Sequence, residues 1–412
     1  MNNYREISKC RISGSTNLIN VLDLGVQSLT GVFPRTVDHP ITSGPMQLAW
    51  CPESGLLQLR HSYDLAEMYG DNYGYRSSLN LSMVTHLKNK VARLMQIVDL
   101  SDGDLVLDIG SNDSTLLQSY SVKGLKRVGI DPTGVKFQHF YTGGVELIPE
   151  FFSSGAFLSK YPALQPKIIT SIAMFYDLED PIRFVSEIAE ILADDGIWHF
   201  EQSYMPSMLE SNAFDTVCHE HLEYYSLDVV RKLLDTCGMK IIDVEINDVN
   251  GGSFAVTAAK RGSGLRANDS QIQRILADEV NLKLHTLEPF HRFRQRVFEF
   301  RDALVGLVRR LNEEGKTVLG YGASTKGNVL LQFCGFSAND IKCIVEVNPD
   351  KFGCYTPGTG IPIISEAEGR ELKPDYYLVL PWHFRKSIVQ RERAFLSEGG
   401  KMIFPLPTLE IV

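Results

Sequence analysis

The stretch that decides the fold is LVLDIGSNDSTLL at Leu105–Leu117, followed by VGIDP at Val128–Pro132. The first apolar run ends in Asp108, turns tightly at Gly110 and enters a polar loop that we expect to begin a helix. The second run ends in Asp131, whose carboxylate could accept hydrogen bonds from a ribose diol. Because the carboxyl ends of parallel strands meet at one sheet edge, this order predicts an α/β fold that binds an adenosine group there.

The loop after Gly110 differs from a pyrophosphate-binding fingerprint, because Asn112 and Thr115 stand at its later glycine positions. Asp108 and Asp113 make the loop acidic, which favours a cationic sulfonium over an anionic pyrophosphate. The two motifs resemble those of class I S-adenosylmethionine (SAM) methyltransferases, and an ordinary strand–turn–helix unit is the alternative. With Phe152 and Ser171 as candidates for the adenine and methionine ends, the predicted cofactor contacts are Asp108, Gly110, Asn112, Asp113, Asp131, Phe152 and Ser171.

Composition limits the classes of function. A chain of 412 residues predicts two or three domains. A net charge of −9 argues against a nucleic-acid binder or a polybasic membrane anchor. No apolar run approaches the ~20 residues of a membrane span, and the N-terminus lacks a signal-peptide pattern. The chain has seven cysteines, an odd number that does not suggest a set of disulfides. We therefore expect a cytoplasmic protein with reduced thiols, no nucleic-acid or membrane partner and no obligate protein partner.

Three regions succeed one another along the chain. Residues 1–80 form a loop-rich module with short strands, and residues 81–263 alternate helices and strands as in a doubly wound sheet. A hairpin turn is expected at Asn250-Gly251-Gly252. Residues 264–412 begin with connector helices, of which the second carries an apolar stripe from Phe290 to Leu311 that we expect to pack on a second Rossmann-like domain.

Two cysteine motifs lie in the first region, CRIS at Cys10–Ser13 and CPES at Cys51–Ser54. Their spacing is that of paired zinc knuckles, but serine stands where each second cysteine belongs. A neutral hydroxyl is a poor zinc ligand, so we expect a knuckle held by hydrogen bonds and packing. A site made of the two thiols with His39 or His61 is the alternative.

The last region contains GYGASTKGN at Gly320–Asn328, and the next strand contains Glu346. Glycines let the backbone approach phosphate oxygens, and Lys326 adds positive charge. We therefore expect a nucleotide or sugar phosphate at this loop, with a purely structural turn as the alternative. The predicted contacts are Gly322, Lys326, Asn328 and Glu346.

Proton-transfer groups are densest in TVCHEHLEYYS at Thr216–Ser226. His219 and His221 could form an H-x-H metal pair, yet no third ligand stands at a familiar spacing. The cluster therefore favours acid–base catalysis, and we expect no metal.

Several motifs recur in order along the whole chain. They are the degenerate C-x-x-C pair, D-I-G-S-N-D, C-H-E-H-L-E-Y-Y, N-G-G-S-F, G-Y-G-A-S-T-K-G-N, N-P-D-K-F-G, P-G-T-G-I-P and L-P-W-H-F. In this order they resemble the three-domain sugar C-methyltransferases of deoxysugar biosynthesis. The resemblance implies SAM-dependent methylation at C3 of a nucleotide-diphosphate 4-keto-deoxyhexose, bound between the middle and C-terminal domains.

The resemblance also suggests roles. His221 is the candidate base that removes the proton beside the ketone, with Glu220 orienting it or binding the sugar and His219 ranked second. Cys218 stands where the family often has tyrosine, so the hydroxyl of Tyr224, Tyr225 or Tyr75 could serve instead. An O- or N-methyltransferase on the same scaffold and a catalytically silent nucleotide-sugar-binding protein are the alternatives.

Overall fold

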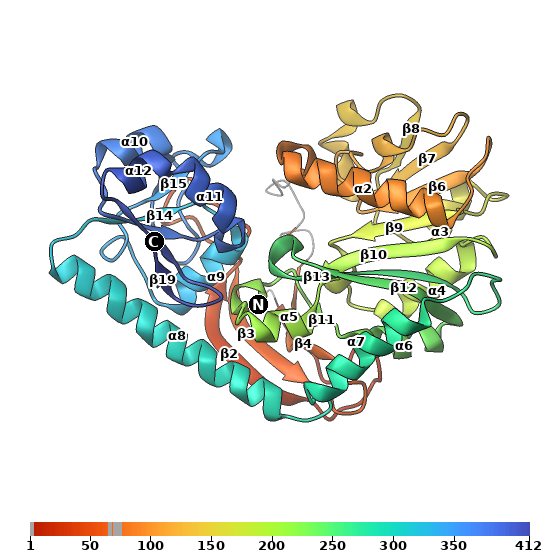
Figure 1. Cartoon of the computed structure of the whole chain (residues 1–412), viewed down its shortest axis with the longest axis horizontal. Helices are drawn as coiled ribbons and strands as arrows, with labels where there is room; N and C mark the ends of the chain where they lie inside the picture. The colour runs from red at the N-terminus through yellow and green to blue at the C-terminus, as the bar shows by residue number, and fades with distance from the viewer. Residues whose placement is uncertain (1–3, 65–67, 69–75) are drawn as a thin grey trace.

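The computed structural model describes residues 4–64, 68 and 76–412. Two α/β lobes stand side by side, and N-terminal strands and one long helix join them underneath (Figure 1). No helix in these described ranges is long and apolar enough to cross a membrane.

The middle lobe contains a seven-stranded sheet in the order β12-β13-β10-β9-β6-β7-β8. All neighbours pair in parallel except β13, which runs antiparallel to both β10 and β12. The strand order reverses beside β6, which is where doubly wound sheets bind ligands. The predicted α/β class is confirmed. The strands are β6 (Leu105–Ile109), β7 (Lys126–Ile130), β8 (Val145–Ile148), β9 (Ile168–Ile172), β10 (Ile197–Ser203), β12 (Met239–Asn247) and β13 (Ser253–Lys260).

Helices cover both faces of this sheet (Figure 1). The apolar face of α2 packs on one side, where Val91 meets Val106 and Ile197 in one core. Two further helices, α4 and α6, pack on the other side against a core that includes Trp198 and Phe200. The helices of this lobe are α2 (Leu81–Ile97), α3 (Ser154–Lys160), α4 (Pro181–Ile191), α5 (Met205–Glu210), α6 (Leu227–Thr236) and α7 (Asp269–Asn281).

The polar loop after Gly110 does not begin an α-helix, which corrects the sequence prediction. Asn112 and Ser114 have φ angles of 50° and 61°. These left-handed conformations interrupt helical geometry, and only a 3₁₀ turn, η2 (Leu117–Ser119), comes next. The carboxyl edge of β6 therefore stays uncovered.

The N-terminal region forms a four-stranded sheet in the order β11-β4-β3-β2, and β1 pairs with β5. Its edge strand β11 comes from the middle region, directly after the C-H-E-H cluster. The amide of Leu59 also donates to the carbonyl of Leu222 at 2.8 Å. The cluster is thereby fixed to the N-terminal module. The strands are β1 (Tyr4–Glu6), β2 (Ile19–Ser28), β3 (Ser43–Trp50), β4 (Leu57–Leu59), β5 (His61–Tyr63) and β11 (Glu223–Tyr224).

The C-terminal lobe contains a six-stranded sheet in the order β16-β15-β14-β17-β18-β19, parallel except for β19. Its strands are β14 (Val318–Tyr321), β15 (Ile344–Glu346), β16 (Ile363–Ser365), β17 (Tyr376–Val379), β18 (Lys401–Phe404) and β19 (Glu410–Ile411). Its helices are α9 (Thr325–Phe333), α10 (Glu366–Glu371), α11 (Arg385–Arg391) and α12 (Arg393–Ser397).

The long helix α8 (Glu288–Glu313) carries the predicted apolar stripe, but this stripe packs on more than the last domain. Phe290 lies 5.5 Å from Trp50 of β3, and Phe300 lies 5.5 Å from Phe214 of the middle region, between ring centroids. One apolar core therefore runs from the N-terminal sheet through α8 into the C-terminal sheet. The N-terminal sheet is too small to bury its own apolar face, and α8 covers it.

Candidate active site

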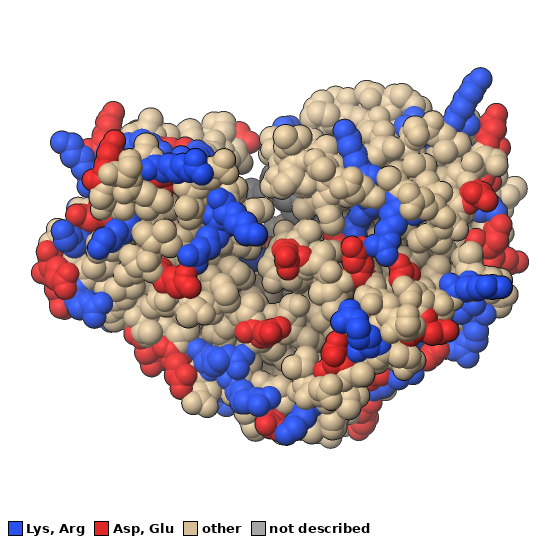
Figure 2. Space-filling model, viewed as in Figure 1, with Lys and Arg blue, Asp and Glu red and all other residues tan. Residues whose placement is uncertain are grey.

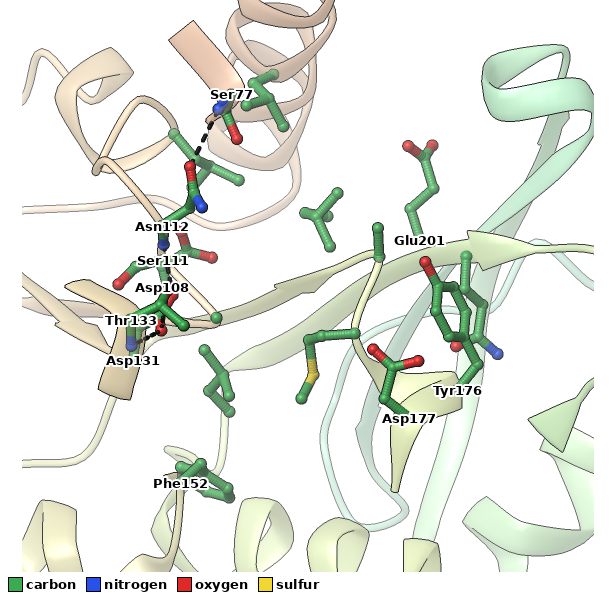
Figure 3. Close-up of a pocket in the computed structure, with 18 of the residues that line it drawn as sticks. Ser77, Asp108, Ser111, Asn112, Asp131, Thr133, Phe152, Tyr176, Asp177 and Glu201 are labelled. Carbon is green, nitrogen blue, oxygen red and sulfur yellow. Dashed lines mark hydrogen bonds between the residues drawn. The ribbon is translucent and has the colours of Figure 1, made fainter. Parts of the chain in front are cut away.

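A cavity of about 390 Å³ lies at the carboxyl edge of the middle sheet, beside the reversal of strand order. Residues from the ends of β6, β7, β9 and β10 line it (Figure 3). Five predicted cofactor contacts lie on its wall: Asp108, Gly110, Asn112, Asp131 and Phe152. The structure thus brings together most of the residues that the sequence proposed for SAM.

Asp131 organises the loop around the cavity. Its Oδ2 accepts from the amide of Asn112 at 2.7 Å, and its Oδ1 accepts from the amide and hydroxyl of Thr133, both at 2.7 Å (Figure 3). Each carboxylate oxygen can accept more than one hydrogen bond. A ribose diol could therefore bind Asp131 without releasing the loop.

Asp108 is the next-to-last residue of β6 and is almost fully buried. Burial raises the pKa of Asp108 to about 7, although the hydroxyl of Thr170 donates to its carboxylate at 2.5 Å. A bound cation would favour the ionised form. Gly110 beside it has a φ of 72°, and a Cβ there would lie 3.2 Å from Cγ of Met174. Both its backbone and its surroundings require glycine.

Asp113 is corrected from a cofactor contact to a structural one, because it does not line the cavity. Its carboxylate accepts from the amide of Ser78 at 2.9 Å and from the hydroxyl of Thr115. Asn112 lines the cavity and also accepts from the amide of Ser77 at 3.0 Å. Together the two side chains hold the chain at Ser77 and Ser78 against the loop.

Ser171 is also corrected. It is fully buried, accepts from the indole N–H of Trp198 at 2.9 Å and does not line the cavity, so the methionine end of SAM needs another partner. Phe152 does line the cavity and packs on Phe184, with the ring centroids 5.1 Å apart.

Glu201 is a cavity residue that the sequence analysis missed. His86 Nε2 and Lys90 Nζ of α2 both lie 2.6 Å from its carboxylate, and Asn247 Nδ2 donates to it at 2.7 Å. Burial alone would raise the pKa of Glu201, but the hydrogen bond from His86 and the Lys90 charge lower it to about 2. The sequence signals were an acid at the end of a strand and two basic residues four apart on one helix face.

His221 packs edge-on against Tyr176, a residue of the cavity wall, with their ring centroids 4.3 Å apart. The Nδ1–H of His221 donates to the carbonyl of Thr216 at 2.8 Å, which leaves Nε2 as the proton-accepting nitrogen. Burial, and then the charge of Lys326, lower the pKa of His221 to about 4. The imidazole is therefore neutral at neutral pH.

Glu220 precedes this histidine and is partly exposed. Burial of its carboxyl group raises the pKa of Glu220 above the usual range. Its Oε2 is buried, with no hydrogen-bond partner among the described residues. Such an oxygen is suited to a donor from a ligand, since an unpaired buried acceptor is unfavourable.

Two other residues of the cluster, His219 and Tyr224, make contacts that stabilise the fold. His219 is fully buried, donates from Nε2 to the carbonyl of Gln27 at 3.2 Å and meets the ring of Tyr63 edge-on. Tyr224 is buried, and its hydroxyl donates to the carbonyl of Thr216 at 3.4 Å. Burial and these hydrogen bonds favour structural roles for both side chains, and their catalytic assignments stay predictions. Tyr75 lies outside the described residues.

Lys326 joins the C-terminal lobe to the cavity. Its Nζ donates to the carbonyl of Asn250, a cavity residue, at 2.8 Å. Nearby, the indole N–H of Trp382 donates to Asp215 at 2.7 Å. Burial and the Lys326 charge also lower the pKa of His383, to about 3. Trp382 and His383 belong to the L-P-W-H-F motif, but the sequence alone did not place them beside the middle lobe.

The other residues predicted to contact phosphate or nucleotide make contacts that stabilise the fold. Asn328 is fully buried and donates to the carbonyl of Thr30 at 2.8 Å, so it holds the N-terminal segment. Gly322 has a φ of 82°, and a Cβ there would lie 2.8 Å from Pro381. Glu346 accepts from the amide of Ala323 at 2.7 Å and from those of the next two residues in the chain. These contacts give Asn328 and Glu346 structural roles, and their contact with a substrate stays a prediction.

The knuckle positions of the N-terminal module meet in crossed pairs. Cys10 Sγ lies 3.3 Å from Ser54 Oγ, and Cys51 Sγ lies 3.4 Å from Ser13 Oγ. Two thiols and two hydroxyls do not fit the usual ligand set of a structural zinc. Within the described ranges no three His, Cys, Asp or Glu side chains are grouped as metal ligands. That the purified protein lacks zinc stays a prediction, which metal analysis tests.

Comparisons with known proteins agree with this architecture. Residues 248–407 match a family described as "C-methyltransferase C-terminal domain", residues 83–244 match a "Methyltransferase domain", and residues 10–69 match a "Putative zinc binding domain". The C-methyltransferase NovU of Streptomyces niveus is 31% identical over 412 residues, covering 99% of this chain and 97% of that relative.

Two solved methyltransferase structures each match less than half of the chain. The mitomycin 7-O-methyltransferase MmcR is 14% identical, with 44% of this chain and 55% of that one covered and a TM-score of 0.34. The plantazolicin methyltransferase BpumL in complex with SAH is 12% identical, with 42% and 82% covered and a TM-score of 0.34.

Fold, cavity and family matches together define a SAM-dependent methyltransferase. The chain belongs to the C-methyltransferase family, whose relative NovU it matches from end to end.

Proposed function

We propose that this enzyme methylates C3 of a nucleotide-diphosphate 4-keto-deoxyhexose through an enolate. The observation that carries the proposal is the state of His221, whose Nδ1–H is fixed on a backbone carbonyl while Nε2 stays unprotonated at neutral pH. Carbon methylation beside a ketone needs a base for the C–H bond and a donor for the enolate oxygen, whereas oxygen or nitrogen methylation needs a base but no such donor. A neutral imidazole beside the cavity meets that need.

The cofactor would lie across the cavity from Asp131 to Asp108, with Phe152 near its adenine. SAM supplies an electrophilic methyl group. If the ribose of SAM binds Asp131 at the end of β7, the methyl-accepting sugar would bind further along the same sheet edge, beyond β9. That end of the cavity is lined by Tyr176, which packs on His221.

Three groups would act on the acceptor. His221 takes the C3 proton, Tyr176 offers a hydroxyl toward the oxygen on which negative charge develops, and Glu220 accepts a hydrogen bond from a sugar hydroxyl. Cys218 is buried, and burial raises the pKa of its thiol well above the usual range, so it does not replace a tyrosine.

The nucleotide diphosphate would lie in the hollow that separates the two lobes in Figure 2. Lys326 reaches from the C-terminal lobe to Asn250 of the middle lobe, with a backbone carbonyl as its hydrogen-bond acceptor rather than a carboxylate. A diphosphate could take its place beside that ammonium group. Acidic and basic side chains are mixed over the face shown in Figure 2, so we propose a small-molecule substrate as the partner.

The test uses SAM with a ¹³C-labelled methyl group and a panel of nucleotide 4-keto sugars. We expect a new C–CH₃ resonance coupled to C3, and exchange of the C3 hydrogen with deuterated solvent. Label found on oxygen or nitrogen would establish the alternative methyltransferase. SAM binding without transfer to any member of the panel would contradict the proposed substrate.

A further inference from the structure

Gly31 of the N-terminal module occupies a position for which the backbone does not require glycine. Its φ lies outside the left-handed region, and the residue is partly exposed. Neither a strained turn nor close packing in the core explains why it lacks a side chain.

A side chain at position 31 would meet Glu220. A Cβ there would lie 2.8 Å from Glu220 Oε1, closer than such atoms approach, and 3.9 Å from Thr325 Oγ1. Residues 31, 220 and 325 belong to the N-terminal, middle and C-terminal regions respectively. All three regions therefore meet beside this one carboxyl group.

The backbone around Gly31 is held on both sides. Thr30 accepts from Asn328 at 2.8 Å, and Pro34 accepts from the amide of Tyr355 at 2.8 Å. The Nζ of Lys351 lies 4.4 Å from the ring centroid of Phe33. With the segment fixed to the C-terminal lobe, an added Cβ would displace the flexible carboxyl end of Glu220 rather than the backbone.

We propose that Gly31 is a positioning residue for the acceptor site: it leaves the space in which the Glu220 carboxyl group stands. The N-terminal module then shapes the acceptor site in addition to supporting the fold. This inference rests on the proposed function, in which Glu220 contacts the sugar.

The experiment compares Gly31→Ala with Gly264→Ala, a matched change at a glycine with no atom within 4 Å of the added Cβ and no left-handed φ. Gly31→Ala should lower kcat/KM for the keto sugar about ten- to a hundred-fold, because small displacements of a positioned group are costly. Its SAM affinity and Tm should equal those of the control. Unchanged kcat/KM, or an equal loss in Gly264→Ala, would overturn the inference.

A double-variant cycle separates positioning from a general structural effect. Asp is one methylene shorter than Glu, so in a Glu220→Asp background the added methyl group should have little further effect on kcat/KM. Additive losses would overturn the inference.

The proposed function and the inference about Gly31 can be tested independently of each other. If the wild-type enzyme methylates no keto sugar, the substrate assignment falls, and a crystal structure of Gly31→Ala decides the remaining claim. Displacement of the Glu220 carboxyl group supports it, and an unmoved carboxyl group contradicts it.

Discussion

The two α/β lobes carry the same local motif with different results. In each, a glycine-containing loop comes after one strand, and an acid at the end of the neighbouring strand accepts from a loop amide. Asp131 accepts from Asn112 in the middle lobe, and Glu346 accepts from Ala323 in the C-terminal lobe, both at 2.7 Å. Only the middle loop borders the cavity.

The two loops lead into different backbone structures. In the middle lobe, left-handed residues prevent a helix, and the sheet edge stays open. In the C-terminal lobe Ser324 caps α9 at once, Lys351 donates to the carbonyl of Ala323 at 2.8 Å, and Pro381 packs against Gly322. An acid and a glycine loop thus stabilise a strand–loop junction in both lobes, and the cavity lies at the one whose sheet edge is left uncovered.

If the chemistry belongs to the middle lobe, the largest effect should come from His221. His221→Asn should lower turnover about a hundred- to ten-thousand-fold, as expected for loss of a general base, with SAM binding unchanged. The matched variant is His383→Asn, another partly exposed histidine with a lowered pKa, from the C-terminal lobe. Rates of methyl transfer and of C3 hydrogen exchange measure both, and equal losses would contradict the assignment.

The two equivalent acids provide the next test. Asp131→Ala should weaken SAM binding by about 1.5–3 kcal/mol, because a charge-assisted contact is lost. Glu346→Ala should leave SAM affinity unchanged, since its carboxylate serves the other loop. Isothermal titration calorimetry distinguishes them, and a similar loss in both variants would break the comparison.

Asp108 should make SAM binding depend on pH. Its pKa near 7 is raised above that of an unfolded chain, so the ligand-free protein loses stability as pH rises from about 4 to 7. The cationic cofactor favours the ionised form, so SAM affinity should increase about tenfold between pH 6 and pH 8. Titrations across this range in the wild type and in Asp108→Asn test this, and an identical pH dependence in both would exclude Asp108.

The smallest effect should come from Lys326. Lys326→Met should raise the KM for the nucleotide sugar several-fold and leave SAM affinity unchanged, because it removes a cation at the lobe interface. Loss of that charge should also raise the pKa of His221, moving the acid limb of the kcat/KM profile to higher pH. A variant that changes SAM binding alone would place Lys326 in the cofactor site.

Much of the cofactor site could be predicted from the sequence, because its signals are local. An acid that ends an apolar run, a tight glycine turn and a second acid after the next strand have one arrangement in a parallel sheet. Asp108, Gly110, Asn112 and Asp131 therefore line the cavity as expected. The predicted hairpin turn at Asn250-Gly251-Gly252 also lies between β12 and β13.

Side-chain roles within the dense polar cluster were decided only by tertiary structure. In sequence His219 and His221 are near equivalents, yet β11 pairs with the N-terminal sheet, and this pairing leaves His219 in the interior and His221 beside the cavity wall. The same holds for Gly31, whose significance depends on a carboxyl group from a distant part of the chain. Local sequence determines where a strand or turn forms, because it sets backbone preferences. Which of two similar side chains meets a ligand depends on long-range packing, which a local pattern does not contain.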